Sequence, residues 1–227
     1  MELQVEKFSY NRSNVILNDV KYSVTPGKIN FLIGSNGTGK TTLLDIFVGL
    51  LGSNNIKKDY QLNNDYIYIN QFLPMLGKMS CKEIIQLILG TIYGELNISK
   101  ENLIKYVDKA NLPFLLKYWD TPYKELSGGE GKLLQLLLFL ETNKSLIVMD
   151  EPTAFLDRKN VYMLFDRIKK NEMATYIIVT HDYRDLLLCD DYTVTILDNG
   201  MIAGAYRKEE FEKENIRNHF ISFFKEI

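Results

Sequence analysis

The segment GSNGTGKT, residues 34 to 41, constrains the fold of this chain more than any other. It matches the pattern G-x-x-x-x-G-K-[ST], follows the apolar run KINFLIG and opens the apolar run TTLLDIFVGLL. This order predicts a buried strand, a tight glycine turn and a helix. Glycines let the backbone N–H groups of such a turn surround one anion, and the helix dipole also favours negative charge there. The segment therefore predicts an α/β fold with an anion-binding loop after a strand.

Two side chains of this loop indicate that the anion is a nucleotide polyphosphate. Lys40 carries a positive charge suited to the β- and γ-phosphates, and Thr41 carries a hydroxyl oxygen suited to Mg²⁺. We expect Thr42 to contact the α-phosphate. The candidate nucleotide-binding residues of the loop are Gly34, Ser35, Asn36, Gly37, Thr38, Gly39, Lys40, Thr41 and Thr42.

Two further apolar runs end in polar residues, SLIVMD at 145–150 and TYIIVTH at 175–181. Such runs are typical of strands buried on both faces of a parallel sheet, where ligands collect at the carboxyl ends of the strands. Adjacent carboxylates at Asp150 and Glu151 repel each other unless a cation or a shared proton lies between them. We therefore expect Asp150 to hold Mg²⁺ and Glu151 to act as general base for the attacking water. Helix capping is the alternative for either residue.

His181 ends the second of these runs. A single histidine at a strand end is often structural. Here the expected sheet brings it to the same edge as Lys40 and Glu151, which favours a contact with the γ-phosphate.

Helical periodicity dominates between Gln71 and Leu126. One helix is expected to open on Ser80 and another on Ser99, each with a side chain suited to capping three residues later. The sequence predicts one domain over 1–227, in which a helical subdomain at 72–125 is inserted into a sheet core.

Pro-Gly and Asp-Asn-Gly turns lie inside the apolar segments 22–33 and 193–206, which predicts a hairpin in each. An apolar stripe on the C-terminal segment is expected to pack on the core of the chain or to form a subunit interface. Its residues are Phe211, Ile216, Phe220, Phe224 and Ile227.

Composition excludes several function classes. The chain has 27 Lys and Arg against 29 Asp and Glu, so it has no basic surplus for a nucleic acid, and we expect no nucleic acid partner. The longest apolar run, residues 133–140, is far shorter than the about 20 residues of a membrane span, and the N-terminus lacks the apolar region of a signal peptide. We expect a cytoplasmic chain. Cys81 and Cys189 lack metal-site spacing and are expected to be buried and free.

A second glycine-rich turn, KELSGGEGK at 124–132, precedes a leucine-rich run. With it, the chain resembles the nucleotide-binding subunits of ATP-binding cassette (ABC) ATPases over nearly its whole length. GSNGTGKTT resembles the Walker A motif, LSGGE the signature, LIVMDEP the Walker B motif, FLD at 155–157 the D-loop and VTHD the His switch. Gln71 resembles the glutamine of the Q-loop. The LSGGE segment is the most specific of these, because other P-loop families lack it.

The resemblance implies ATP and Mg²⁺ as ligands and ATP hydrolysis as the reaction. It implies an α/β fold: a P-loop NTPase core with a mainly parallel sheet, an antiparallel β arm and an inserted helical subdomain. The implied catalytic residues are Glu151, His181 and Lys40, and the implied metal ligands are Thr41, Gln71 and Asp150. Outside the loop, the implied nucleotide-binding residues are Tyr10, Gln71, Ser127, Gly128, Gly129, Glu130 and Asp157.

Tyr10 corresponds to the aromatic residue that stacks on adenine in this family. Phe8 is the competing candidate, and packing on the core is the alternative for Tyr10.

In this family two cassettes pair head to tail, so that Walker A of one subunit and the signature turn of the other enclose one ATP. The resemblance thus implies a second ABC subunit, with a homodimer favoured, and a separate integral membrane permease. The chain would lie on the inner face of the cell membrane and power transport, with a bacterial exporter favoured. The alternative is a non-transport ABC ATPase of DNA repair, chromosome organisation or translation.

Four residues depart from the family pattern. Glu130 stands where Gln is commoner, and Leu133 stands where many cassettes carry Arg. In the D-loop, Ala154 and Phe155 stand where Ser and a small residue are usual, which is expected to affect communication between the two sites. The apolar residues after Gln71 are expected to form the permease groove, with core packing as the alternative for each. These are Phe72, Leu73, Met75 and Leu76.

Overall fold

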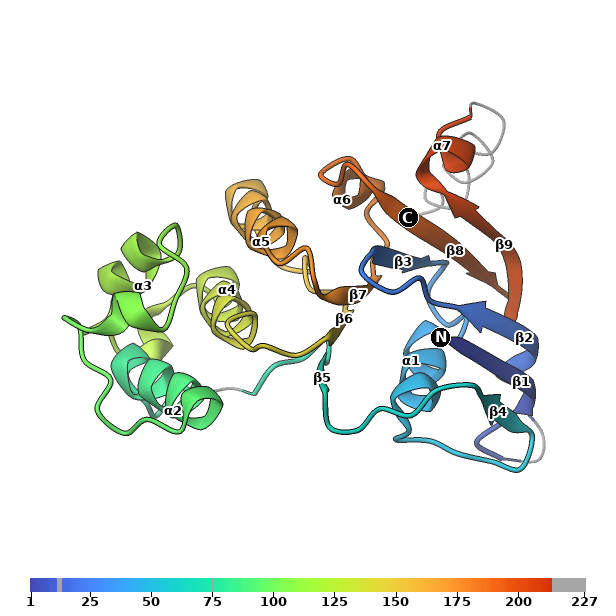
Figure 1. The fold of residues 1–227 in the computed structure, drawn as a ribbon, viewed down its shortest axis with the longest axis horizontal. Coiled ribbons are helices and arrows are strands. Elements are labelled where there is room, and N and C mark those ends of the chain that lie inside the picture. The colour runs from blue at the N-terminus through green and yellow to red at the C-terminus, as the bar shows by residue number, and fades with distance from the viewer. Residues whose placement is uncertain (12–13, 75, 214–227) are drawn as a thin grey trace. The chain divides into compact units, whose positions relative to one another are not determined.

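The computed structural model describes residues 1–11, 14–74 and 76–213 of the 227-residue chain (Figure 1). It contains two compact units. The sheet unit consists of Met1–Gln71, Lys144–Pro152 and the residues from Glu172 onward, and the helical unit consists of Phe72–Asn143 and Thr153–Asn171. Of the expected C-terminal stripe, Phe211 is completely buried, and the other four residues lie outside the described residues.

A six-stranded sheet forms the centre of the sheet unit, with the strand order β5-β6-β7-β3-β8-β9 (Figure 1). The strands are β3 (Ile29–Ile33), β5 (Tyr66–Ile69), β6 (Leu146–Asp150), β7 (Thr175–Val179), β8 (Tyr192–Asp198) and β9 (Met201–Arg207). All neighbouring pairs are parallel except β8 and β9. Every residue of β6 and β7 is buried, as near-continuous apolar runs require. The three buried strands predicted from the sequence are thus confirmed, as is a mixed α/β fold with a mostly parallel sheet.

A separate three-stranded antiparallel sheet has the order β2-β1-β4. Its strands are β1 (Glu2–Phe8), β2 (Leu17–Ser23) and β4 (Ile56–Lys58). The predicted hairpin over 22–33 is wrong, because β2 pairs with β1 whereas β3 pairs with β7 and β8. Its Pro-Gly turn instead joins strands of two different sheets. The hairpin over 193–206 is confirmed as β8 and β9, with Asn199 and Gly200 in the left-handed backbone region.

Besides α1 (Lys40–Val48), the described part of the sheet unit contains two short helices, α6 (Tyr183–Leu186) and α7 (Lys208–Phe211).

Helix α1 supplies apolar side chains to the core of the sheet unit, which also contains buried residues of β1, β2, β6 and β7. Leu43, Leu44 and Phe47 of α1 are completely buried. This packing fixes the start of α1, and therefore the glycine loop before it, against the sheet.

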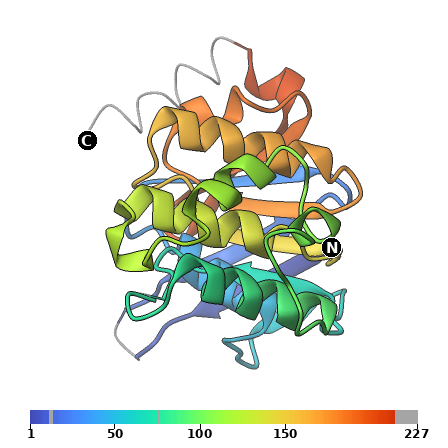
Figure 2. The same cartoon turned by 90° about the vertical axis from the view of Figure 1, so that its left-hand side faces the viewer.

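In the helical unit, α4 lies between α2 and α5 (Figures 1 and 2). The elements of the helical unit are α2 (Cys81–Tyr93), η1 (Leu103–Lys105), α3 (Leu112–Tyr118), η2 (Tyr123–Glu125), α4 (Gly128–Phe139) and α5 (Arg158–Lys170). This unit extends beyond 72–125 because it includes α4 and α5. A subdomain limited to 72–125 therefore stays a prediction.

The helix predicted to open on Ser80 is confirmed, including its capping box with Glu83. The helix predicted to open on Ser99 is wrong, since only the 3₁₀ turn at Leu103–Lys105 forms there. The Asn102 side chain accepts a hydrogen bond from Ser99 N–H at 2.7 Å and donates one to Asn97 O at 2.7 Å. These local bonds compete with a helix for the polar groups of this segment.

A buried ion pair joins α5 to the end of α4 within the helical unit. Arg167 donates to the Glu141 carboxylate over 3.0 and 3.3 Å, and the two side chains are only 11% and 6% exposed. Glu141 also accepts from Asp108 N–H at 3.1 Å and from Asn111 Nδ2 at 3.2 Å. These bonds compensate the buried charge.

Candidate functional site

Packing against neighbouring backbone dictates the shape of the glycine loop between β3 and α1. A Cβ atom on Gly34 would lie 2.1 Å from Leu197 O. Gly39 has φ 101°, and a Cβ there would lie 2.9 Å from the Leu17 side chain. Gly39 is also the N-cap of α1 and offers no side chain to cap it. The first N–H groups of α1 therefore lack a capping acceptor, as an anion-binding turn requires.

Lys40 holds its ammonium over this loop. Its Nζ donates to Gly34 O and to Ser35 O, both at 2.8 Å. Burial lowers the pKa of Lys40, while the nearby charges of Glu151 and Asp150 act in the opposite direction. The loop thus has a buried cation available to a polyphosphate.

Asp150, the last residue of β6, meets the first turn of α1. Thr41 Oγ1 donates to Asp150 Oδ2 at 2.6 Å, and Asp150 is only 3% exposed. Burial raises the pKa of Asp150, whereas the bond from Thr41 lowers it. Helix capping is wrong for Asp150 and for Glu151, because Asp150 ends a strand and Asp157 is the N-cap of the next helix, α5.

The hydroxyl and carboxylate oxygens of Thr41 and Asp150 are hard ligands of the kind that Mg²⁺ prefers. Within the described residues, no group of three or more His, Cys, Asp or Glu could hold a metal ion. A cation here would therefore need further oxygens from a phosphate. Because Mg²⁺ typically combines one or two protein ligands with phosphates and waters, these residues fit it.

Glu151 lies between two other predicted site residues. Gln71 Nε2 donates to Glu151 Oε2 at 2.8 Å, and His181 Nδ1 lies 3.5 Å from Glu151 Oε1. Glu151 has φ 48°, a left-handed conformation that is uncommon outside glycine and costs about 1 kcal/mol or more. This conformation ends strand β6 after Asp150. The direction of the Glu151 side chain is therefore not set by the alternation of side chains between the two faces of the sheet.

A pocket of about 410 Å³ brings the loop together with these groups in the sheet unit. Its walls come from five segments that are far apart in the sequence. Four of them follow the carboxyl ends of the parallel strands β3, β5, β6 and β7, and the fifth is Ile16, directly before β2. The lining residues are Ile16, Asn36, Gly37, Gly39, Lys40, Thr41, Thr42, Gln71, Glu151 and His181. Ile16 was not predicted from the sequence, because an apolar side chain carries no chemical signal and Ile16 enters the wall only through the fold.

Of the two aromatic candidates near the loop, Tyr10 is the accessible one. It is 63% exposed and its hydroxyl lies 3.2 Å from Thr42 Oγ1, whereas Phe8 is 7% exposed. The two rings meet edge to face with centroids 5.4 Å apart. Phe8 thus supports Tyr10 from the core side, and Tyr10 does not itself line the pocket.

The remaining predicted site residues belong to the helical unit. Ser127 is the N-cap of α4 and forms a capping box with Glu130. Gly128 has open space where a Cβ would lie, and a Cβ on Gly129 would lie 2.8 Å from Phe155 O. Asp157 caps α5 by accepting from Asn160 N–H at 2.8 Å.

Three of the departures from the family pattern differ in accessibility. Leu133 is completely buried, so an arginine there would be costly. Phe155, in contrast, is 76% exposed with φ 68°. Glu130 lies at the start of α4 with its side chain 32% exposed.

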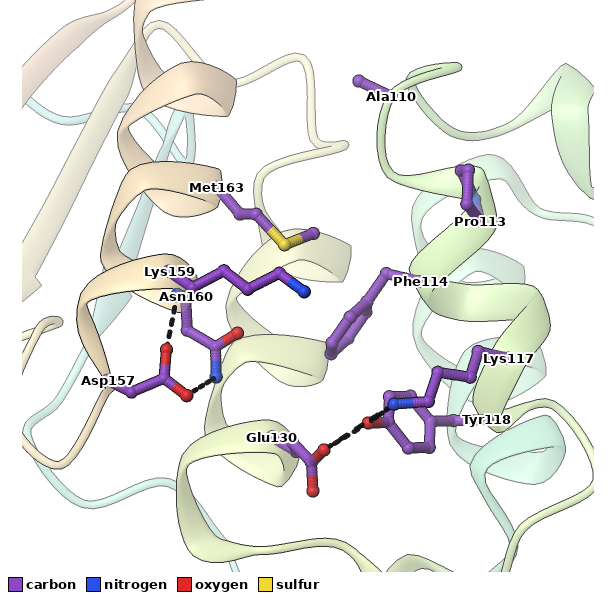
Figure 3. Close-up of a pocket in the computed structure, with 10 residues that line it drawn as sticks. All are labelled: Ala110, Pro113, Phe114, Lys117, Tyr118, Glu130, Asp157, Lys159, Asn160 and Met163. Atoms are coloured by element: carbon purple, nitrogen blue, oxygen red, sulfur yellow. Dashed lines mark hydrogen bonds and ion pairs between the residues drawn. The ribbon is translucent and has the colours of Figure 1, made fainter.

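A second pocket, of about 370 Å³, lies in the helical unit between α3 and the first turns of α4 and α5 (Figure 3). Only Glu130 and Asp157 among its lining residues were singled out from the sequence. The lining residues are Ala110, Pro113, Phe114, Lys117, Tyr118, Glu130, Asp157, Lys159, Asn160 and Met163.

Comparison with known proteins decides the family. The family model described as "ABC transporter" matches residues 17–154. The chain belongs to the ABC transporter family. This confirms the resemblance drawn from its motifs, and it makes the chain an ABC transporter ATP-binding subunit.

Individual relatives of this ABC cassette are also named as ATP-binding proteins of transporters. It is 29% identical over 201 residues to a putative ABC transporter ATP-binding protein of Methanosarcina acetivorans, covering 80% of this chain and 73% of that protein. It is 28% identical over 250 residues to the energy-coupling factor transporter ATP-binding protein EcfA2 of Ligilactobacillus salivarius, covering 98% and 85%. The solved ADP conformation of MJ1267, an ATP-binding cassette of an ABC transporter, superposes with a TM-score of 0.75 at 24% identity, covering 99% of both chains. That last likeness shows the fold.

Among the residues that the structure describes, no helix is long and apolar enough to cross a membrane. Cys81 and Cys189 are buried, as predicted, and neither forms a disulfide within the described part of the chain. Phe72, the first of the apolar residues after Gln71, is 76% exposed, whereas Leu76 packs partly against the core of the helical unit. Met75 lies outside the described residues.

Proposed function

We propose that this ABC cassette binds Mg²⁺ and ATP in the 410 Å³ pocket and hydrolyses ATP there, with Glu151 as the general base. The observation that carries the proposal is the position of the Glu151 carboxylate. It shares the pocket with the glycine loop and lies between Gln71 and His181. A carboxylate at the end of a buried strand, next to a phosphate-binding loop, can orient and deprotonate a water molecule for attack on the γ-phosphate.

The other residues of the pocket take the roles that their chemistry suits. The backbone N–H groups of the loop and the Lys40 ammonium bind the phosphates, and Thr42 contacts the α-phosphate. Thr41, Asp150 and the side-chain oxygen of Gln71 hold the metal ion, since the Gln71 amide nitrogen is directed to Glu151. When bound, Mg²⁺ supplies positive charge to the β- and γ-phosphate oxygens.

His181 and Tyr10 contact the two ends of the ATP molecule, the γ-phosphate and the adenine. The exposed His181 imidazole beside Glu151 contacts the γ-phosphate. Tyr10 stacks on the adenine, because its ring is accessible and its hydroxyl lies against the loop helix.

The signature turn serves the nucleotide of a second copy of this chain in a head-to-tail dimer. Ser127 and Gly128 are exposed, and the first turn of α4 presents N–H groups to an anion. Gly129 and Glu130 shape that turn, and Asp157 holds the start of α5 beside it. The homodimer is the simplest pair, because one chain carries both halves of the composite site.

We further propose that the cassette acts with a separate membrane permease on the inner face of the cell membrane. Its relatives support transport: those named above are transporter ATP-binding proteins, and others at 27% identity are named ribose import and zinc import ATP-binding proteins. These names give no support to DNA repair, chromosome organisation or translation. The export direction stays a prediction, because an exporter of the Atm1 family is only 20% identical and shows the fold alone.

Glu151→Gln tests the catalytic assignment. The amide oxygen of the new side chain can still accept from Gln71, so the pocket keeps its shape while the base is lost. We expect ATP affinity within about twofold of wild type and a turnover lowered about 10²-fold or more.

Phosphate release and nucleotide binding would be measured on the purified protein, with the permease present if pairing needs it. Glu172→Gln, at an exposed position of the same unit, is the matched control and should behave as wild type. Wild-type turnover in Glu151→Gln would rule out Glu151 as the base.

A further inference from the structure

The Glu130 carboxylate is the centre of a hydrogen-bond network at the start of α4. Its Oε2 accepts from Ser127 N–H at 3.0 Å and from Ser127 Oγ at 2.8 Å. Its Oε1 accepts from the Tyr118 hydroxyl of α3, and Tyr118 in turn accepts from Lys117 Nζ. Figure 3 shows Tyr118 and Lys117 facing Glu130 across one end of the pocket. Both carboxylate oxygens are therefore engaged, one by α4 and one by α3.

This network determines to which group the Ser127 hydroxyl donates its proton. A carboxylate can only accept hydrogen bonds, so the bond between Ser127 Oγ and Glu130 Oε2 takes the hydroxyl proton. Ser127 Oγ also accepts from Glu130 N–H at 3.2 Å. The orientation of Ser127 thus depends on where the Glu130 carboxylate is held.

A negative charge in this place creates a conflict with the proposed function. The first turn of α4 is where we expect a phosphate of the partner's ATP, and a carboxylate there competes for the same N–H groups and repels the phosphate. A neutral glutamine would cause no such repulsion. This chain therefore needs a way to keep the Glu130 charge directed away from the open N–H groups.

We propose that Tyr118 is a positioning residue for the signature turn, which draws the Glu130 carboxylate toward α3 and so keeps the turn receptive to phosphate. The inference rests on the proposed function of Ser127 and its neighbours. Lys117 assists because its ammonium donates to the Tyr118 hydroxyl and lies 4.0 Å from Glu130 Oε1. The hydrogen bond from Tyr118 and those from Ser127 also lower the pKa of Glu130, which keeps it ionised and bound to both partners.

The proposal predicts that Tyr118 matters only when residue 130 carries a charge. Tyr118→Phe removes the hydroxyl alone and should lower ATP turnover about tenfold, while ATP affinity at the glycine loop stays within about twofold. Glu130→Gln provides an uncharged background, and its own turnover is the reference for the double variant. Adding Tyr118→Phe to Glu130→Gln should change that turnover less than about twofold, so the glutamine removes the dependence on the Tyr118 hydroxyl.

Turnover, the KM for ATP and urea unfolding would be measured for the wild type, both single variants and the double variant. Tyr93→Phe is the matched control, because its hydroxyl donates to backbone carbonyls of Tyr106 and Glu141 in the same unit, away from Glu130. It should keep wild-type turnover. Lys117→Met provides a second test if Tyr118→Phe does not fold, with a smaller loss that Glu130→Gln also removes.

Two outcomes would overturn the inference while the proposed function stands: an active wild type with full turnover in Tyr118→Phe, or an equal loss from Tyr118→Phe in both backgrounds. A wild type that binds no ATP, or binds but does not hydrolyse it, would instead overturn the proposed function and this inference with it.

Discussion

Removing the Thr41 hydroxyl should weaken the metal site without disturbing the rest of the pocket. Thr41→Ala deletes the 2.6 Å hydrogen bond to Asp150 and, in our proposal, one oxygen ligand of Mg²⁺. Thr41→Ser keeps the oxygen and is the matched control. The two variants therefore separate the role of the hydroxyl from that of the methyl group.

The size of the effect follows from the exposure of Thr41. Loss of a group that supplies or orients a metal ligand lowers metal affinity about 10- to 100-fold. Thr41 is exposed, so water can take the place of its hydroxyl, and we expect the lower end of this range. The Mg²⁺ concentration for half-maximal turnover should therefore rise about tenfold in Thr41→Ala.

The pH dependence provides an independent check. The Thr41 bond lowers the pKa of Asp150, against the burial that raises it, so Thr41→Ala should raise this pKa further. The metal needs the ionised carboxylate, and its binding is lost as the pH falls through the pKa of Asp150. The acid limb of Mg²⁺ activation should therefore shift to higher pH in Thr41→Ala.

The assay is a Mg²⁺ titration of phosphate release at saturating ATP, repeated across pH for wild type, Thr41→Ala and Thr41→Ser. If Thr41→Ala and Thr41→Ser gave the same half-maximal Mg²⁺ concentration and the same acid limb, the assignment of Thr41 as metal ligand would be refuted.

Two further predictions concern the adenine contact and the helical unit. Tyr10→Ala should weaken ATP binding about fivefold and Tyr10→Phe hardly at all, measured by nucleotide titration, since stacking contributes about 1 kcal/mol; equal affinity in all three proteins would remove Tyr10 from the site. Arg167→Met should lower the free energy of unfolding in urea by about 3 kcal/mol, the low end for a broken buried pair, because Glu141 keeps two other donors. Arg184→Met, which breaks an exposed pair with Asp182, is its control and should change stability little.

The sequence predicted the fold best where short segments consist almost entirely of apolar residues, because such segments must be buried. Near-continuous apolar runs at 28–34, 145–150 and 175–181 predicted strands of a parallel sheet, and the parallel arrangement then placed their end residues at one edge. That is why Lys40, Glu151 and His181 could be expected together before the pocket was known.

Features that depend on contacts between distant segments could not be predicted. The Pro-Gly turn in 22–33 has hairpin chemistry, but β3 lies between β7 and β8 in the six-stranded sheet, whereas β2 pairs with β1. Ser99 and Asn102 have capping chemistry, but their side chains and backbone bond locally instead. The contact of Tyr118 with Glu130 has no sequence signature, because it depends on how α3 packs beside α4.

We expect one ATP to be held between the glycine loop of one copy and the signature turn of another, and a mixed dimer of two variants can test this arrangement. Lys40→Ala disables the loop, and Ser127→Arg fills the phosphate position of the turn. A dimer of one copy of each combines both defects in one composite site and leaves the other site intact.

Phosphate release and bound ATP would be measured for each variant alone and for the mixture, with the permease present if pairing needs it. We expect each variant alone to be inactive and the mixture to regain part of the turnover, with about one closed ATP site per mixed dimer. Mixed dimers that form but hold no intact ATP site would contradict it.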